Sequence, residues 1–353
     1  MSDRPVGLAL LSFAHGHQTA WCRSLQADPR ARVVCAWDDE PSRGRAAADA
    51  LGVAFESDLD RVLGRAEVDA VTICAENHAH AELAVRAAEA GKQIMMQKPM
   101  ATTLADCDRI VAAVERAGVT YMQSYNLRFD PVHLRIKELV DAGALGRVNI
   151  VRRRHSHHFA LRAEDRERVL GFMTDPLRAG GGALMDEGAH VTLWYLWMFG
   201  PPTSVTAAVE TRTPGLAVED NAAVIYRWAD GMLGIHQTSW TEVAGDATTE
   251  IFGDQGTIVQ TGADIASTRP HGPAAAELRP LKLYTLEAGR WEYPDVPLLL
   301  NRSALVTGPF VDMLVQDAPS PCDVRTARLG VEMLLAAYRS AREGRTVPIP
   351  LAR

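Results

Sequence analysis

The stretch AGKQIMMQKP, residues 90–99, indicates the end of a helix, a short buried strand and a turn. Gly91 suits the residue after a helix, and the apolar residues that follow suit a strand. Lys98 comes directly after this strand. The carboxyl ends of parallel strands line the crevice where such sheets bind ligands. Lys98 is therefore a candidate functional residue, with a surface lysine in a turn as the alternative for so short a motif.

The composition is that of a globular protein with two domains. The chain has 353 residues, too many for one typical core, and 47% are hydrophobic and 23% charged. The net charge of −7 argues against nucleic acid as a partner. No apolar run is long enough for a membrane span, and the N-terminus leads into a strand rather than a signal peptide. Five scattered cysteines without CxxC spacing suit free thiols in a reducing cytoplasm.

Strands alternate with helices in the first third of the chain. The expected strands cover residues 6–11, 33–37, 53–55, 68–74, 93–96 and 120–123. Such alternation is typical of a doubly wound parallel sheet. We therefore expect an α/β fold that begins with a Rossmann domain over residues 1–124.

After residue 131 the pattern changes to long strands. These are expected at residues 148–157, 203–210, 222–228, 232–240, 248–252 and 256–260. An amphipathic helix at 182–198 interrupts them, and the pieces within 262–302 look partly like loop. Residues 125–353 are therefore expected to form an α+β domain with a large, mostly antiparallel open sheet. The basic run RRR at 152–154 is interpreted as a solvated strand edge rather than a polyanion site.

An acidic residue at the end of the second strand suggests a dinucleotide site. Asp38 is placed to accept hydrogen bonds from both hydroxyls of an adenosine ribose. The same carboxylate would repel the 2′-phosphate of NADP, which favours NAD, although Arg43 nearby weakens this preference. The alternative is that Asp38 and Asp39 form an ordinary acidic loop.

The glycine-rich loop expected after the first strand is degenerate. Residues 10–15 read LLSFAH, so leucine, serine and histidine stand at the three glycine positions. Ser12 and Ala14 are still small, and backbone amides at a helix N-terminus still bind phosphate. His15 would add a donor to the pyrophosphate. The alternative is that His15 and His17 only cap the helix.

Four stretches together resemble the Gfo/Idh/MocA family of oxidoreductases. They are AENHAH at 75–80, AGKQIMMQKP at 90–99, YNLRFDP at 125–131 and GGGALMDEGAH at 180–190. The family patterns are PNxxH, AGKHVxxEKP, YNxRFxP and GGGxLxDxGxH. The resemblance implies a Rossmann domain followed by a sheet domain for substrate binding and association, commonly in dimers or tetramers.

The chain departs from the family pattern at three places. The glycine loop is degenerate. Gln97 stands where the family usually has glutamate, which removes a negative charge beside Lys98. Leu193 stands where many members have aspartate. The resemblance implies these cofactor contacts: Ser12, Phe13, Ala14, His15, Asp38, Asp39, Arg43, Ala75, Asn77, His80, Gln97 and Lys98.

The resemblance also implies the catalytic residues. His190 would be the acid/base, while Lys98 would hydrogen-bond the reacting oxygen across the crevice and share the proton transfer. Asp186 would orient the substrate or the histidine, because it lies four residues before His190 on one helix face. For His190 alone, a buried core histidine is the alternative. Tyr125 and Arg128 would bind substrate or, alternatively, brace the hinge between the domains.

Two further histidines alternate on one face of a strand. His155 and His157 are expected to bind substrate through hydrogen bonds. The alternative is a metal site that they form with Glu187 or His190. We favour the interpretation without a metal.

The sequence thus predicts an NAD(H)-dependent oxidoreductase acting on a secondary alcohol or ketone of a sugar, cyclitol or related polyol. NADP is the less favoured cofactor. Two alternatives remain: a lyase or hydrolase that uses transient sugar oxidation with bound NAD, and a non-catalytic ligand-sensing regulator. We expect a cytoplasmic homodimer or homotetramer with no nucleic acid or membrane partner. The sequence does not name the substrate.

Overall fold

The computed structural model describes residues 4–243, 247–261, 279–297, 299, 302 and 304–352. The expectation of loop at 262–278 lies outside these residues. The chain forms two compact units. The first unit comprises residues 1–126, 177–180 and 301–331, and the second comprises 127–176, 181–300 and 332–353.

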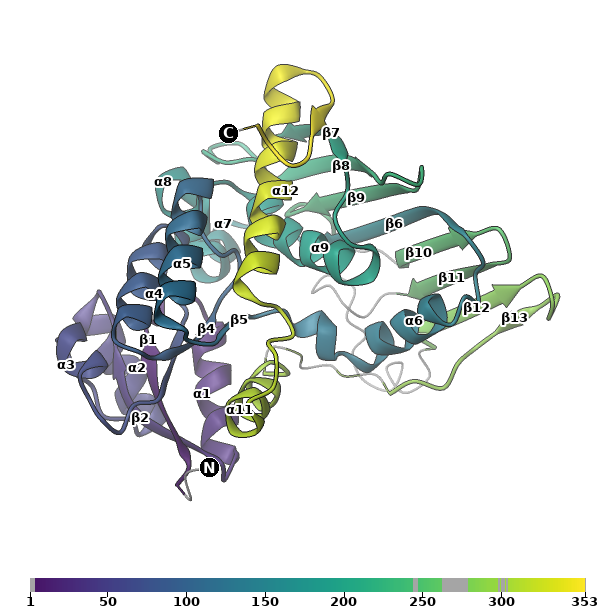
Figure 1. Cartoon of the computed structure of the whole chain (residues 1–353). Coiled ribbons are helices and arrows are strands. Elements are labelled where there is room, and N and C mark those ends of the chain that lie inside the picture. The colour runs from purple at the N-terminus through teal and green to yellow at the C-terminus, as the bar shows by residue number, and fades with distance from the viewer. Residues whose placement is uncertain are drawn as a thin grey trace. The chain divides into compact units, whose positions relative to one another are not determined.

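The first unit contains a five-stranded parallel sheet in the order β2-β1-β3-β4-β5 (Figure 1). Its strands are β1 (Val6–Leu11), β2 (Ala31–Trp37), β3 (Ala70–Ile73), β4 (Gln93–Met96) and β5 (Tyr121–Gln123). The expected Rossmann sheet is confirmed. The strand expected at 53–55 was wrong, because this segment touches β2 only at a single bridge between Ala36 and Phe55.

The helices of the first unit lie between its strands along the chain, except α11, which comes later. They are α1 (His17–Ala27), α2 (Pro41–Leu51), α3 (Leu59–Leu63), α4 (His80–Glu89), α5 (Leu104–Ala117) and α11 (Thr307–Gln316). Helix α11 comes late in the chain, yet it packs against α1, where Ser24 Oγ and Thr307 Oγ1 lie 2.7 Å apart. Helix α5 shows the usual local signals: Thr103 caps its start, and Gly118 ends it in a left-handed conformation.

The second unit contains a nine-stranded sheet in the order β13-β12-β11-β10-β6-β9-β8-β7-β14 (Figure 1). Its strands are β6 (Val148–Ser156), β7 (Ser204–Glu210), β8 (Asn221–Arg227), β9 (Leu233–Ser239), β10 (Ala247–Gly253), β11 (Gly256–Thr261), β12 (Leu281–Thr285), β13 (Trp291–Glu292) and β14 (Val347–Pro348). Neighbouring strands run antiparallel except β6 and β9, which run parallel. The expected open, mostly antiparallel sheet is confirmed.

Helix α9 (Ala183–Phe199) lies across β6, β8 and β9 (Figure 1). The helix predicted at 182–198 is present, but the prediction that it is amphipathic was wrong. Most of its residues are buried, because one side packs on the sheet and Leu334 of α12 (Val324–Glu343) packs near Gly188. A helix that is covered on several sides has apolar residues on more than one face. Helices α6 (Pro131–Asp141) and α7 (Ala163–Asp165) complete the unit's main elements.

The basic run at 152–154 is not at a strand edge, which corrects the sequence interpretation. Strand β6 is central and pairs with β10 on one side and β9 on the other. Arg153 is 1% exposed, donates to Thr249 Oγ1 and, at 3.2 Å, to Gln260 Oε1. Its guanidinium also lies 5.4 Å from the centre of the Trp194 ring. Arg153 therefore stabilises the layer between the sheet and α9 rather than a solvated edge.

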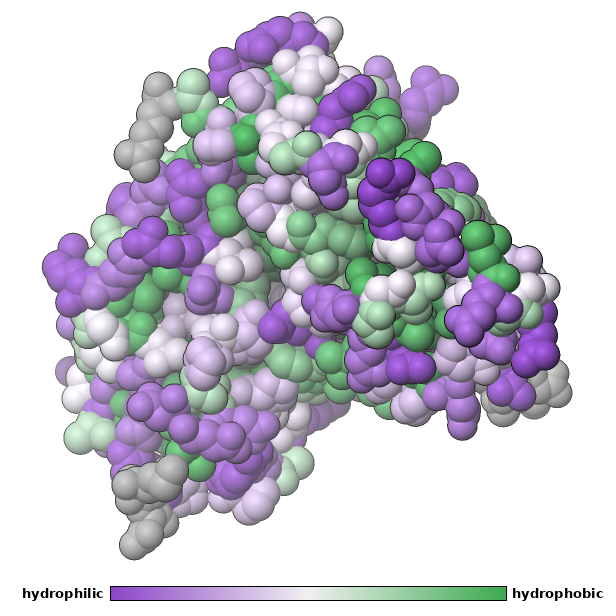
Figure 2. Space-filling model, turned by 45° about the vertical axis from the view of Figure 1, so that its right-hand side comes forward, coloured by the Kyte–Doolittle hydropathy of each residue, from purple (hydrophilic) through white to green (hydrophobic). Residues whose placement is uncertain are grey.

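The visible surface is mixed in character. Hydrophilic and hydrophobic residues are interspersed over the face shown in Figure 2. Among the residues that the structure describes, no helix is both long enough and apolar enough to cross a membrane.

Candidate functional site

The loop between β1 and α1 is held by side chains instead of glycines. The Phe13 N–H donates to Asp38 Oδ2 at 2.7 Å, and the Ala14 N–H to Ser12 Oγ at 3.3 Å. Ser12 has a φ of 67°, in the left-handed region that favours glycine. The loop therefore keeps a tight turn with a serine at the position where the family pattern has glycine.

Asp38 is an anchor for this loop. Its Oδ1 accepts from the Glu40 N–H (2.9 Å) and from Arg43 Nη2 (2.6 Å), while Oδ2 accepts from Arg43 Nε (3.1 Å) as well as from Phe13. Burial alone would raise the pKa of Asp38, but the hydrogen bonds from Arg43, Glu40 and Phe13 outweigh it and lower the pKa. Asp38 thus uses both oxygens within the protein, while the neighbouring Asp39 side chain is 48% exposed.

Arg43 lies among three carboxylates. Its Nη2 is 2.9 Å from Asp39 Oδ1, and its Nη1 is 3.2 Å from Glu40 Oε2, in addition to the contacts with Asp38. Burial and the nearby Asp38 raise the pKa of Asp39. The local charge is therefore negative despite the arginine.

The N-terminus of α1 offers room and donors for a phosphate group. Gly16 precedes the helix without a side-chain cap, and a Cβ added there would meet nothing within 4 Å. Backbone N–H groups at a helix start favour anions. The exposed carboxylate of Asp39 lies beside the same loop, with its Oδ1 3.2 Å from Ser12 Oγ, so the loop fits the phosphate and ribose of a dinucleotide.

Gln97 connects the end of β4 to two histidines of this loop. Its Oε1 accepts from the Lys98 N–H and from Ser124 Oγ, both at 2.8 Å, which directs its Nε2 toward Nδ1 of His15 (3.1 Å) and His17 (2.6 Å). The His17 N–H also donates to Nδ1 of His15, at 3.2 Å. Both Nδ1 atoms are therefore acceptors, and each neutral ring carries its proton on Nε2.

His80 braces the turn that contains Lys98. Its ring nitrogens lie 2.9 Å from the Pro99 carbonyl oxygen and 3.1 Å from that of Ala75. Burial lowers the pKa of His80 to about 4. His80 thus positions both loops, and Lys98 itself is 4% exposed.

A short segment, residues 177–180, is bound to the loop after β3. Asn77 donates to the Ala179 carbonyl oxygen at 2.8 Å. Arg178 Nε donates to Glu76 Oε2 at 2.6 Å. Asn77 therefore has a positioning role within the first unit.

Glu219 closes the N-terminus of α9. Its carboxylate accepts from the N–H groups of Gly182 and Leu184, each at 2.9 Å, and from the Tyr338 hydroxyl at 2.6 Å. A Cβ on Gly182 would lie 1.9 Å from the Glu219 carbonyl oxygen, so only glycine fits there. Burial raises the pKa of Glu219. No local sequence motif pointed to this residue.

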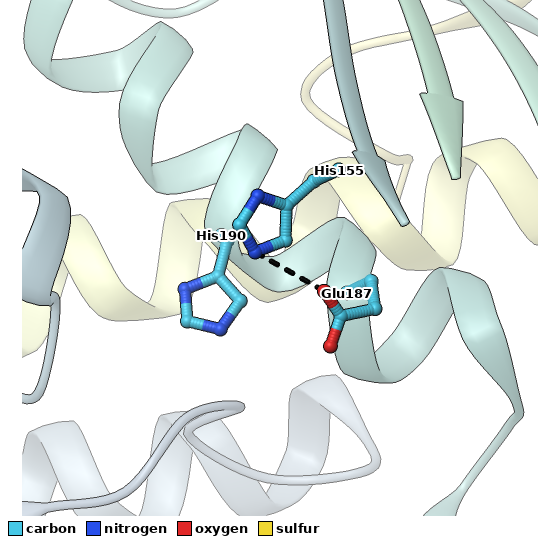
Figure 3. Close-up of side chains that lie close together, drawn as sticks. All are labelled: His155, Glu187 and His190. Atoms are coloured by element: carbon cyan, nitrogen blue, oxygen red, sulfur yellow. Dashed lines mark ion pairs between the residues drawn. The ribbon is translucent and has the colours of Figure 1, made fainter. Parts of the chain in front are cut away.

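Five polar side chains from the end of β6 and the start of α9 come together. His155 Nε2 lies 3.1 Å from Glu187 Oε2, and the rings of His155 and His190 are 4.7 Å apart (Figure 3). His157 Nε2 lies 3.6 Å from Glu187 Oε1 and 4.0 Å from Asp186 Oδ2. The structure thus brings together the four predicted residues of this set, together with Glu187, which the sequence raised only for a metal site.

Trp240 supports this cluster, although no sequence pattern pointed to it. Its Nε1 donates to Asp186 Oδ2 at 3.2 Å, and its ring stacks on His157 with centroids 6.2 Å apart. Of the other expected substrate residues, Tyr125 is 1% exposed in the first unit. Arg128, in the second unit, lies over the Trp197 ring at 5.2 Å.

Two family patterns match the chain. The pattern described as "Oxidoreductase family, NAD-binding Rossmann fold" matches residues 13–125. The one described as "GFO/IDH/MocA C-terminal domain" matches residues 133–259.

Two relatives found by sequence and one solved structure are consistent with these family matches. The chain is 43% identical to inositol 2-dehydrogenase 1 of Saccharopolyspora erythraea over 119 residues, 33% of this chain and only 35% of that relative. It is 30% identical to inositol 2-dehydrogenase 2 of the same organism over 260 residues, 71% of this chain and 73% of that relative. A solved levoglucosan dehydrogenase, in complex with NADH and levoglucosan, has a TM-score of 0.82 at 21% identity, covering 98% of this chain and 100% of that one. The likeness to the solved structure shows the fold. The second relative, at 30% identity over 73% of its length, and the two family matches show that the chain belongs to the Gfo/Idh/MocA family of NAD-binding oxidoreductases.

Proposed function

We propose that the protein is an NAD(H)-dependent oxidoreductase of a secondary alcohol or ketone in a sugar, cyclitol or related polyol. The observation that carries this proposal is the cluster of Asp186, His190 and β6 histidines on a chain with a dinucleotide-fitting Rossmann loop. Two relatives named inositol 2-dehydrogenase support the substrate class.

The cofactor would be held by the β1–α1 loop and its neighbours. We assign the pyrophosphate to residues 12–17, where His15 and His17 present Nε2–H donors, and the ribose to the exposed Asp39. Asp38 positions the loop. A 2′-phosphate would add negative charge beside the carboxylates that surround Arg43, which favours NAD over NADP.

The protein's own residues would handle the hydroxyl proton. When bound, NAD supplies the acceptor for the hydride, so that the alcohol carbon is oxidised as the nicotinamide is reduced. Lys98 would hydrogen-bond the reacting oxygen, and the proton would pass to His190 or Lys98. Asp186, held by the Trp240 indole, would orient the substrate.

The first test is a fluorescence titration with NADH and NADPH, followed by turnover assays on inositols and anhydrosugars. We expect tighter binding of NADH than of NADPH. Lys98→Ala should reduce kcat by about a hundredfold or more, because it removes a proton-handling group. Lys137→Ala, on helix α6, is the control.

Near-wild-type turnover in a folded Lys98→Ala protein would contradict the role of Lys98. Substrate loss without net change in NADH absorbance would indicate instead the lyase or hydrolase that the sequence left open. Saturable binding of polyols without any reaction would indicate the ligand-sensing regulator.

We also propose that a second copy of the chain covers the outer face of the nine-stranded sheet. Glu250, Arg152, Ile235 and Ile225 lie side by side across four strands on this face. Ile225 is 41% exposed, and Arg152 pairs with Glu250 at 2.9 Å. A face with apolar groups and both charges can be self-complementary about a two-fold axis.

Five buried free cysteines support a reducing, cytoplasmic location.

A further inference from the structure

We propose that His155, Glu187 and His190 bind a divalent transition-metal cation. The sequence favoured substrate hydrogen bonds for the β6 histidines, and the geometry points instead to a ligand set. The binding site does not depend on the proposed function. Only the role of the cation, considered below, rests on it.

The side chains of His155, Glu187 and His190 place their possible ligand atoms close together. Each provides one nitrogen or carboxylate oxygen, and these atoms lie within 4.8 Å of one another. His155 is 6% exposed and His190 is 8% exposed, so the site is largely shielded from water. In Figure 3 the two rings and the carboxylate border the same small space. Small side-chain adjustments would place each of the three ligand atoms at a distance of roughly 2.0–2.2 Å from a bound ion, the length typical of zinc–nitrogen and zinc–oxygen bonds.

The backbone holds these residues in place without the metal. His155 is on the inward-facing row of central strand β6, which is paired on both sides. Glu187 and His190 lie one turn apart on α9, whose first turn Glu219 caps. A site on rigid elements needs little reorganisation to bind an ion.

Charge also favours a cation. The three proposed ligands include one carboxylate, Glu187, whose Oε2 lies 3.1 Å from His155 Nε2. The ring centroids of His155 and His190 lie 4.7 Å apart. Protonating both histidines would place two positive charges close together in a buried site. A divalent cation lets both rings stay neutral and bind through a lone pair, with Glu187 as the anionic ligand.

The neighbours of the site resemble the outer support of a metal centre. The other carboxylate oxygen of Glu187 faces His157 Nε2 at 3.6 Å. His157 in turn stacks on Trp240, which donates to Asp186. Such contacts orient ligands and tune their basicity.

The ligand types indicate the class of ion. Two imidazoles and one carboxylate suit Zn²⁺, Mn²⁺ or Fe²⁺ rather than Ca²⁺ or Mg²⁺. Three protein ligands leave positions open for adjacent hydroxyls of a polyol, whose acidity the cation would increase. A histidine that binds a cation is no longer the proton acceptor at that nitrogen. If the proposed function holds, the proton would therefore go to Lys98, acting as a neutral amine, rather than to His190.

The decisive experiment measures metal binding without cofactor or substrate. Protein purified without a metal-affinity tag is analysed by inductively coupled plasma mass spectrometry, then stripped with EDTA and titrated with Zn²⁺ and with Mn²⁺ by calorimetry. We expect one cation per chain. Glu187→Gln and His155→Asn should weaken binding by at least about a hundredfold, because each removes a ligand. His158→Asn, the next histidine along the chain but outside the cluster, should bind like the wild type.

Circular dichroism and NADH binding, which uses the first unit, verify that each variant is folded. Absence of saturable binding in the wild type, or equal affinity in folded Glu187→Gln and wild type, would overturn the proposal. Full polyol turnover by EDTA-stripped, metal-free protein would overturn the role of the cation in the reaction and leave the proposed function intact. Stoichiometric metal binding without any polyol turnover would support the site and refute the proposed function.

Discussion

Two unusual residues of this chain compensate for each other. Gln97 replaces the glutamate that the family usually has, and His15 replaces a glycine of the phosphate loop. In the structure the Gln97 amide donates to Nδ1 of both His15 and His17. A glutamate has no such donor. The glutamine is therefore matched to a histidine-containing loop.

Gln97→Glu should weaken NADH binding by about tenfold. The new carboxylate would face Nδ1 of both His15 and His17, whose lone pairs are already directed at it, and a buried polar group without a hydrogen-bond partner costs about 1–3 kcal/mol. The measurement is an NADH fluorescence titration of Gln97→Glu, with and without His17→Ala. The two substitutions should be non-additive. Additive effects would show that Gln97 does not act through the histidines.

A second residue-scale feature is His236 on strand β9. It is fully buried, and neither ring nitrogen has a hydrogen-bond partner among the described residues. Burial, with a smaller effect of the Arg153 charge, lowers the pKa of His236 to about 3. The unfolded chain binds this proton near a pH of about 6.5, while the folded chain does not. The unfolding free energy is therefore not reduced by this group above that pH, and it falls as the pH drops toward the pKa of His236 in the folded protein.

His236→Leu should remove this part of the acid sensitivity. Between pH 7 and pH 5.5, the wild type should lose about 1 kcal/mol more unfolding free energy than the variant. At pH 7 the variant should be as stable as the wild type, because an unbonded buried imidazole is replaced by an apolar group. Guanidinium denaturation at both pH values tests this. An equal loss in both proteins would show that His236 does not titrate as described.

At the scale of the element, α9 decides the geometry of the polar cluster. Its first turn carries Asp186, and its second carries Glu187 and His190. The first turn is closed by Glu219, from the connection just before β8, which the chain can approach only because residue 182 is glycine. The position of the cluster therefore depends on a carboxylate that is not part of it.

Glu219→Ala should destabilise the protein by about 2 kcal/mol, since it leaves the first N–H groups of α9 without their acceptor. It should also reduce turnover, because Asp186 lies in the same turn. Thermal and denaturant unfolding are compared with Glu210→Ala, an exposed glutamate at the end of β7. Equal stability of the two variants would contradict the capping role.

At the scale of the whole molecule, the outer face of the nine-stranded sheet is the surface we assign to a second copy. Ile225→Lys places a charge within the Ile225–Ile235 row of this face. We expect it to turn a dimer into a monomer, as measured by light scattering after size-exclusion chromatography. Leu177→Lys is the control, because Leu177 is 85% exposed and lies in the first unit. A wild-type monomer, or a variant that still dimerises, would contradict the assignment.

The sequence predicted most of the fold, because its signals are local. Period-two and period-3.6 patterns reported the strands and helices of both sheets, and the failures have physical causes. Segment 53–55 is strand-like in composition but finds only one bridge with β2. The α9 pattern could not show that both a sheet and α12 cover the helix. The run at 152–154 could not show that β6 is central.

The sequence by itself determined the order of elements and the family, and it named the candidate site residues, since each is written in short stretches of neighbouring residues. Only the tertiary structure decided the partners of those residues. Gln97 meets His15 across 82 positions, and Leu184 of α9 meets Glu219 across 35. His155 of β6 meets Glu187 of α9 only through the packing of that helix on the sheet. Such contacts depend on strand register and helix packing, which arise from the whole chain and leave no local pattern.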